Sequence, residues 1–243
     1  VRGLDVSAPA EFIDPSGAAA IQNIEINRNI IRKRTGTTAI GSTLGERVMA
    51  YNELRTGEGN YLYRFGPTSV EILDRTALTW SDVTGTALNG LTTDLYDFAY
   101  PLLNGQRILT FTNEIDNIRK LTGAANSADL GGTPPKCRYM VAYQSYLILG
   151  YIIDGGSVFP SELAWCDTAD PENWTTGNSG NAFLVADGEN ITGMGLSGPY
   201  FTIHMESSIS LGNGVTTSDV FRVERKNTGI GLAAHQTIKN IPN

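Results

Sequence analysis

Two apolar segments of the sequence, RYMVAY at Arg138–Tyr143 and YLILG at Tyr146–Gly150, decide the fold class. Neither alternates cleanly between apolar and polar residues, which predicts β-strands that are covered on both faces. The small side chain of Ala142, and the absence of one at Gly150, would let neighbouring backbone approach closely. These segments therefore predict inner strands of a sheet that lies between two other sheets.

The same pattern recurs along the chain, as short segments that alternate or run apolar and then break at Gly, Asn, Asp or Pro. This is typical of strands and turns. A helix is expected at one place, where Asp14 could cap one or two turns over Pro15–Asn23. We expect strands at Ile24–Asn27, Ile30–Lys33, Arg47–Glu53, Tyr61–Phe65, Val70–Asp74, Tyr96–Tyr100, Gln106–Thr112, Asn117–Lys120, Arg138–Tyr143, Tyr146–Tyr151, Glu162–Cys166, Phe183–Ala186, Ile191–Leu196, Tyr200–Met205, Ser208–Leu211 and Val220–Arg225.

Thr-Gly dipeptides divide the chain into intervals of 38 to 54 residues, each holding three or four expected strands. Two further Thr-Gly pairs, ending at Gly57 and Gly193, fall inside intervals, so the repeat is degenerate. We interpret the dipeptide that closes each interval, as in TWSDVTG at Thr79–Gly85, as an end-of-unit turn. The dividing dipeptides end at Gly36, Gly85, Gly123, Gly177 and Gly229.

Repeats of this size, built of antiparallel strands, are typical of β-propeller blades. The sequence predicts an all-β fold, with an N-terminal arm and hairpin over residues 1–36 and a β-propeller-like array of antiparallel blades over 37–243. A β-sandwich of similar strands is the alternative. Trp80 and Trp174 are expected to be packing residues at equivalent places in their units. Leu232–Ile238 is expected to begin another strand, which would close the ring or continue beyond residue 243.

The composition limits the classes of partner. The chain has 243 residues, a formal net charge of −7, 18% charged residues and 27 glycines. An acidic balance disfavours general binding to nucleic acid. The local exception is NRNIIRKR at Asn27–Arg34. Its charges either protect an edge strand from unwanted pairing or contact DNA or an acidic partner, and the residues concerned are Arg28, Arg32, Lys33 and Arg34.

No motif predicts catalysis, a cofactor or a metal. Gly193–Gly198 matches GxGxxG, but Pro199 and a strand follow where a dinucleotide site needs a helix. His204 and His235 have no nucleophile motif nearby, and no carboxylate pair has the spacing of a glycosidase. Cys137 and Cys166 are expected to be reduced, partly buried thiols in an intracellular assembly compartment. No segment has the length and apolarity of a membrane span.

Several segments together resemble virion proteins of tailed bacteriophages, in particular the nozzle-like proteins of the tail or neck. The likeness extends along the whole chain without a single diagnostic motif. It implies a β-propeller-like fold and no catalytic residues. The segments that carry it are Leu4–Pro9, Phe12–Pro15, Ile30–Gly36, Tyr96–Ala99, Ile108–Asn113, Tyr146–Gly150, Leu163–Cys166, Asp170–Trp174 and Val220–Arg225.

The resemblance implies a structural virion protein that assembles in the host cytoplasm. Its expected partners are further copies of itself in a ring, neighbouring tail or neck proteins, and genomic DNA passing through the exit channel. The alternative function is a glycan-binding β-propeller of a virion that recognises a host receptor through exposed aromatic residues, namely Trp80, Trp165 and Trp174.

Overall fold

The computed structural model describes residues 40–184, 188–214 and 220–238, together with four short strands nearer the start of the chain. The chain divides into two compact units, Val1–Ile40 and Gly41–Asn243. The described residues contain no α-helix, and their one helical turn is the 3-10 segment η2 (His235–Thr237). The fold is all-β with several antiparallel sheets, which confirms the all-β part of the predicted fold.

The first unit contains two strand pairs. In one, β3 (Ile24–Asn27) and β4 (Ile30–Lys33) are antiparallel, with Asn27 opposite Ile30, which confirms the predicted hairpin. In the other, β1 (Gly3–Leu4) runs parallel to β2 (Gly17–Ala18). The expected helix over residues 15–23 is therefore wrong at β2, where strand pairing outweighs helix propensity that a glycine already weakens. The rest of that segment lies outside the described residues.

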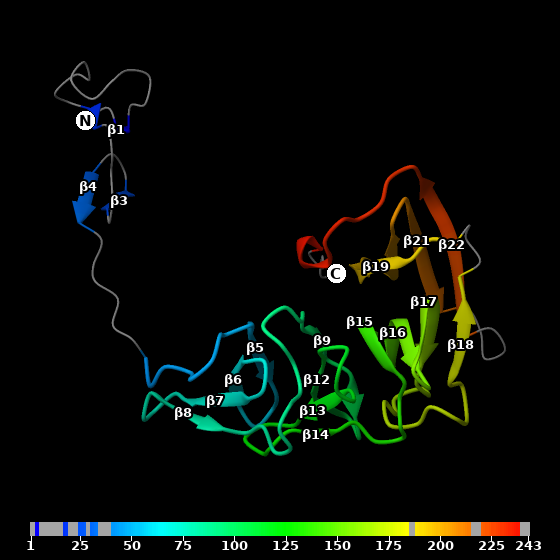
Figure 1. Ribbon diagram of the computed structural model, residues 1–243, viewed down its shortest axis with the longest axis horizontal. Coiled ribbons are helices and arrows are strands. Elements are labelled where there is room, and N and C mark those ends of the chain that lie inside the picture. The colour runs from blue at the N-terminus through cyan, green and yellow to red at the C-terminus, as the bar shows by residue number, and fades with distance from the viewer. Residues whose placement is uncertain are drawn as a thin grey trace. The chain divides into compact units, whose positions relative to one another are not determined.

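The second unit contains four four-stranded antiparallel sheets, each built from a consecutive part of the chain (Figure 1). A small hairpin, β10 (Leu102–Leu103) with β11 (Gln106–Arg107), interrupts the second sheet. The first sheet consists of β5 (Ala50–Arg55), β6 (Asn60–Phe65), β7 (Val70–Asp74) and β8 (Thr79–Asp82), and the second consists of β9 (Asp97–Ala99), β12 (Leu109–Thr112), β13 (Arg119–Leu121) and β14 (Ala128–Asp129). The third sheet consists of β15 (Lys136–Tyr143), β16 (Tyr146–Asp154), β17 (Ser157–Trp165) and β18 (Gly180–Phe183). The fourth sheet consists of β19 (Ile191–Ser197), β20 (Tyr200–Met205), β21 (Ser208–Gly214) and β22 (Phe221–Thr228).

The strand predictions fail mainly where hydrophobic periodicity is weak. Residues 79–82, the first half of TWSDVTG, form the edge strand β8 instead of a turn. The expected strand over residues 106–112 is broken at Ile108, whose N–H bonds the carbonyl of Pro101. Strand β14 was not predicted, because two residues are too few to show a period.

Each sheet shares a buried core with the next. Phe65 of the first sheet packs edge-on against Phe111 of the second, with ring centroids 5.1 Å apart. The second and third sheets bury Ile118 and Met140 together, and the third and fourth bury Leu163 with Met194. The sheets are thus covered on both faces where the sequence predicts it.

Close approach at Gly150 is confirmed, because a Cβ placed there would lie 2.5 Å from the sulfur of Met194 in the next sheet. Both cysteines lie in the core between the second and third sheets as free thiols. Burial raises the pKa of Cys166 to about 11 and that of Cys137 well above its usual value. Both thiols are fully buried, where the sequence predicted partial burial.

Four of the dividing Thr-Gly dipeptides have a glycine with positive φ, which the incidental ones lack, and the fifth, ending at Gly36, lies outside the described residues. Gly85, Gly177 and Gly229 have φ of +69°, +69° and +80°, and Gly123 has φ of +141°. The glycines at 57 and 193 are outside this region. The dipeptide follows the last strand in the first and fourth sheets but precedes it in the second and third. It is a required turn, though not always the end of a unit.

Two matched substitutions test this distinction. Gly85→Ala is expected to lower the free energy of unfolding by about 1 to 3 kcal/mol, because alanine is strained at φ of +69° and its Cβ would meet the carbonyl of Ser127 at 2.6 Å. Gly57→Ala, in the other class of Thr-Gly pair, has open space around it and should change stability by less than about 1 kcal/mol. Denaturant unfolding of both variants measures the difference, and equal effects would contradict it.

Candidate functional site

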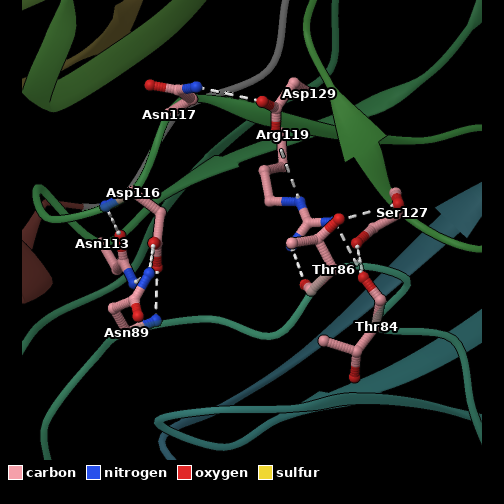
Figure 2. Close-up of polar contacts among 9 residues, drawn as sticks. All are labelled: Thr84, Thr86, Asn89, Asn113, Asp116, Asn117, Arg119, Ser127 and Asp129. Atoms are coloured by element: carbon pink, nitrogen blue, oxygen red, sulfur yellow. Dashed lines mark hydrogen bonds and ion pairs between the residues drawn. The ribbon is translucent and has the colours of Figure 1, made fainter.

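The most extensive buried polar contact joins the first sheet to the second through Arg119 of β13 (Figure 2). Its Nη1 donates to the carbonyl of Thr86 at 2.5 Å, and its Nη2 donates to the carbonyls of Thr84 and Ser127 at 2.8 and 3.0 Å. The planar guanidinium suits several acceptors held at fixed angles. The side chain is only 4% exposed, and the nearest carboxylate oxygen, on Asp129, is 3.8 Å from Nε.

The acceptors are held by the turn that TWSDVTG forms. The Thr84 hydroxyl bonds the Asp82 carboxylate at 2.6 Å and accepts from the N–H of Val70 at 2.7 Å. The N–H and the hydroxyl of Ser127 bond the carbonyls of Val83 and Thr84. Hydrogen bonds from the Thr84 side chain and backbone hold the pKa of Asp82 below its usual value. TWSDVTG is therefore a strand and a turn that docks against the next sheet.

A second polar group fixes the same connection further along (Figure 2). The Asp116 carboxylate accepts from the N–H of Asn89 at 2.9 Å and from its amide nitrogen at 2.7 Å. Asn113 donates to the same carboxylate at 2.8 Å. Burial opposes ionisation of Asp116, but the hydrogen bonds from Asn113 and Asn89 outweigh it and lower its pKa. Residues 84–89 are thus tied to the second sheet at both ends.

The first strands of the four sheets contribute to one cavity. Strand β15 contacts β9 on one side and β19 on the other, and the Tyr100 hydroxyl beside β9 bonds the Asn52 side chain of β5. These strands line a cavity of about 460 Å³. A neighbouring cavity of about 590 Å³ is lined in part by Asp97, Arg138 and His235. The first strands of the four sheets therefore line a shared concave surface.

The segment after β22 lies against strands β9, β15 and β19. The Nε2 of His235 is 3.0 Å from the Asp97 carboxylate, whose other oxygen accepts from the N–H of Met140. The His235 ring also packs on Tyr139, with centroids 4.9 Å apart. The expected strand at residues 232–238 is therefore wrong, because side-chain contacts with β9 and β15 hold this segment as a 3-10 turn.

The two histidines have different surroundings. The Nδ1 of His235 is buried without a hydrogen-bond partner among the described residues, and a Cβ at Gly193 would lie 2.9 Å from it. His204 contacts the Thr202 hydroxyl at 3.2 Å. Burial, with the nearby His235, lowers the pKa of His204. No group of three potential metal ligands occurs in the ranges that the structure describes, nor does any helix there have the length and apolarity to cross a membrane.

The structure does not test the predicted basic contact. Arg32 and Lys33 belong to β4, opposite Glu25 and Ile24 of β3. Arg28 and Arg34 lie outside the described residues. The role of the four basic residues stays a prediction.

The tryptophans are not equivalent, so that expectation is wrong. Trp80 lies in β8 beneath the guanidinium of Arg64, 4.4 Å from its ring centroid. Trp174 lies in the connection from β17 to β18 and donates to the carbonyl of Pro171. Trp165 donates to the carbonyl of Asn178 and packs edge-on against Phe221. Similar dipeptides follow Trp80 and Trp174, but the turns have different places in their sheets.

Removing the guanidinium tests how strongly Arg119 joins the sheets. Arg119→Ala is expected to lower the free energy of unfolding by about 2 to 4 kcal/mol, because the buried Ser127 carbonyl and the part-buried Thr86 carbonyl lose a hydrogen-bond donor and the Thr84 carbonyl keeps only the Ser127 hydroxyl. Asp129→Ala, which removes the exposed carboxylate, should cost less than about 1 kcal/mol. Chemical denaturation compares the two variants. Similar losses would mean that the ion pair, rather than the carbonyl contacts, stabilises this junction.

The carboxylate of Asp116 predicts a particular acid dependence. Because its folded-state pKa lies below the usual 3.8, its contribution to stability is present above that value and is lost as the pH falls through the folded-state pKa. Asp116→Asn should therefore reduce the slope of unfolding free energy against pH below about pH 4. Asn89→Ala, which removes one donor, should reduce it less. An unchanged slope in Asp116→Asn would contradict the assignment.

No protein-family model matches the sequence, and no curated protein sequence matches it either.

Proposed function

We propose that this chain is a non-enzymatic structural protein of a tailed-phage particle, in which copies assemble as a ring at the tail or neck and contribute to the DNA exit channel. The observation that carries the proposal is the series of four antiparallel sheets with a buried core between each consecutive pair. Such a series of packed sheets would serve as a rigid scaffold, which is what a structural protein needs.

The same series supports a β-propeller-like array. The sheets follow one another in chain order, and their first strands meet at shared cavities, as the inner strands of blades do. A β-sandwich has two sheets facing each other, whereas four separate sheets share three cores here. The propeller-like arrangement is therefore the better description of the scaffold.

Assembly with further copies is supported by the two outer sheets. The first and fourth sheets each share a core with one neighbour among the described residues. On the first sheet, Tyr51 is 60% exposed on the face opposite the shared core, beside Trp80. If one outer sheet of each copy met the other outer sheet of the next, this head-to-tail contact would form a closed ring wherever the rotation between copies closes.

The acidic balance fits a channel that releases DNA. With a net charge of −7, the chain repels phosphate on average and would hold passing DNA weakly. The basic hairpin at residues 24–34 would then contact a neighbouring protein, or DNA at one level of the channel. This contrast in charge supports a role in attachment for the first unit and in the channel wall for the second.

Charge reversal tests the role of the hairpin. Particles carrying Arg32→Glu, Lys33→Glu and Arg34→Glu are expected to assemble poorly or to lose packaged DNA, measured as particle yield and DNA content. The control carries the same change in charge at three exposed residues of the second unit, Arg55, Arg107 and Arg222. Normal assembly and DNA retention in the hairpin variant would exclude this role.

Imaging of intact particles tests the proposal as a whole. Gold-labelled antibody against the chain should mark the tail or neck of the particle, and the purified protein should show a multiple of its 26.2 kDa mass. Labelling elsewhere, or absence from purified particles, would overturn the virion assignment. The ring proposal would be wrong if the protein were a monomer in solution and were also present as a single copy in the particle.

A further inference from the structure

A groove forms on the third sheet because its neighbour is too small to cover it. The strands of the second sheet are 3, 4, 3 and 2 residues long, and those of the third are 8, 9, 9 and 4. Both sheets share a core, but the outer half of β17 and the edge strand β18 extend beyond it. There the surface holds a cavity of about 390 Å³.

Three aromatic rings line this groove. Phe159 and Trp174 pack against the margin of the shared core, and Phe183 of β18 is 58% exposed. Phe159 and Phe183 meet edge to face, with centroids 6.1 Å apart. Pro160 follows Phe159 in β17, where the pairing with β16 is irregular. This irregularity puts Phe159 on the same face as Glu162, although a regular strand would place them on opposite faces.

Polar groups converge between the rings. Glu162 is opposite Phe183 in the sheet and only 7% exposed, yet its one hydrogen bond among the described residues is a 2.6 Å contact to Oε1 from the Asn181 amide. Its Oε2 is not fully enclosed and has no hydrogen-bond partner among the described residues, and Glu162 is one of the residues that line the groove. Asp154 and Thr175 add a carboxylate and a hydroxyl. A buried carboxylate with one open oxygen is a ready hydrogen-bond acceptor.

The lining selects the class of ligand. No lysine or arginine lines the groove in the described ranges, whereas Asp154 and Glu162 do, so anionic ligands are disfavoured. Aromatic rings offer flat apolar surfaces, and carboxylate and amide groups pair with neighbouring hydroxyls. We propose that this groove binds a neutral oligosaccharide, with one sugar ring against Phe183 or Trp174 and its hydroxyls on Glu162 and Asn181.

A basic peptide is the competing occupant, since two carboxylates also attract cations. The observations favour a saccharide, because the open acceptor lies beside a donor amide on Asn181, and a hydroxyl both donates and accepts whereas an ammonium only donates. Of the tryptophans, Trp174 lines this groove, whereas Trp80 and Trp165 are engaged by Arg64 and Phe221. The inference does not depend on the proposed ring or on its place in a particle.

Calorimetric titration of the whole chain with maltoheptaose, cellohexaose and chitohexaose tests the groove. At least one of these neutral oligosaccharides is expected to bind, with a heat of binding that is unaffected by high salt. Phe183→Ala should weaken binding at least about fivefold, since aromatic contact contributes measurably to affinity. Glu162→Gln, which keeps an acceptor for Asn181 but changes the open oxygen, should also weaken it.

The control is Tyr51→Ala, which removes an exposed aromatic residue of β5 outside the groove and should leave the affinity unchanged. Circular dichroism confirms that each variant is folded. No heat with any of the three oligosaccharides would overturn the proposal, and so would binding that survives both groove variants. Binding of oligolysine in their place would assign the groove to a basic peptide, and loss of a dimer in Phe183→Ala would assign it to a second copy of the chain.

Discussion

The second unit depends on one constraint: sheets that are apolar on both faces must be covered on both. A strand such as β16 carries buried residues on each side, and a single sheet of four short strands cannot remove both sets from water. Serial stacking solves this, because each sheet covers one face of the next. The cores of Phe65 with Phe111, and of Leu163 with Met194, are the outcome.

Stacking by itself does not set the spacing of the sheets, and buried polar contacts do so at the first junction. Arg119 donates hydrogen bonds to three backbone carbonyls at fixed angles. These bonds fix the position of the turn at Gly85 on the second sheet. The next junction uses a different device, an ion pair in which Lys120 and the N–H of Gly131 meet Glu172. Hydrophobic burial supplies most of the free energy that holds neighbouring sheets together, and these directional contacts fix how the sheets are positioned on one another.

The two proposed functions, assembly as a ring and binding of a saccharide, depend on different features of this scaffold. A ring protein uses the scaffold as a whole and needs rigid junctions and exposed outer sheets. A saccharide groove uses the mismatch between a small second sheet and a large third one. Both are compatible with one chain, because the groove at Phe183 and the outer face at Tyr51 belong to different sheets.

The sequence by itself determined the all-β class, most strands, the β3–β4 hairpin and the turns at the dividing Thr-Gly dipeptides, because these follow from local periodicity and turn chemistry. Only the tertiary structure decided which polar residues meet. Asp97 and His235 are 138 residues apart in the chain. Arg119 bonds backbone carbonyls, which every residue type has, so no residue type in the sequence marks its partners. Edge strands β8 and β14 were not predicted for a related reason. The neighbouring strands of their sheets stabilise them, while their own residues show no hydrophobic periodicity. Contacts of this kind arise from how the sheets stack, which no short window of sequence contains.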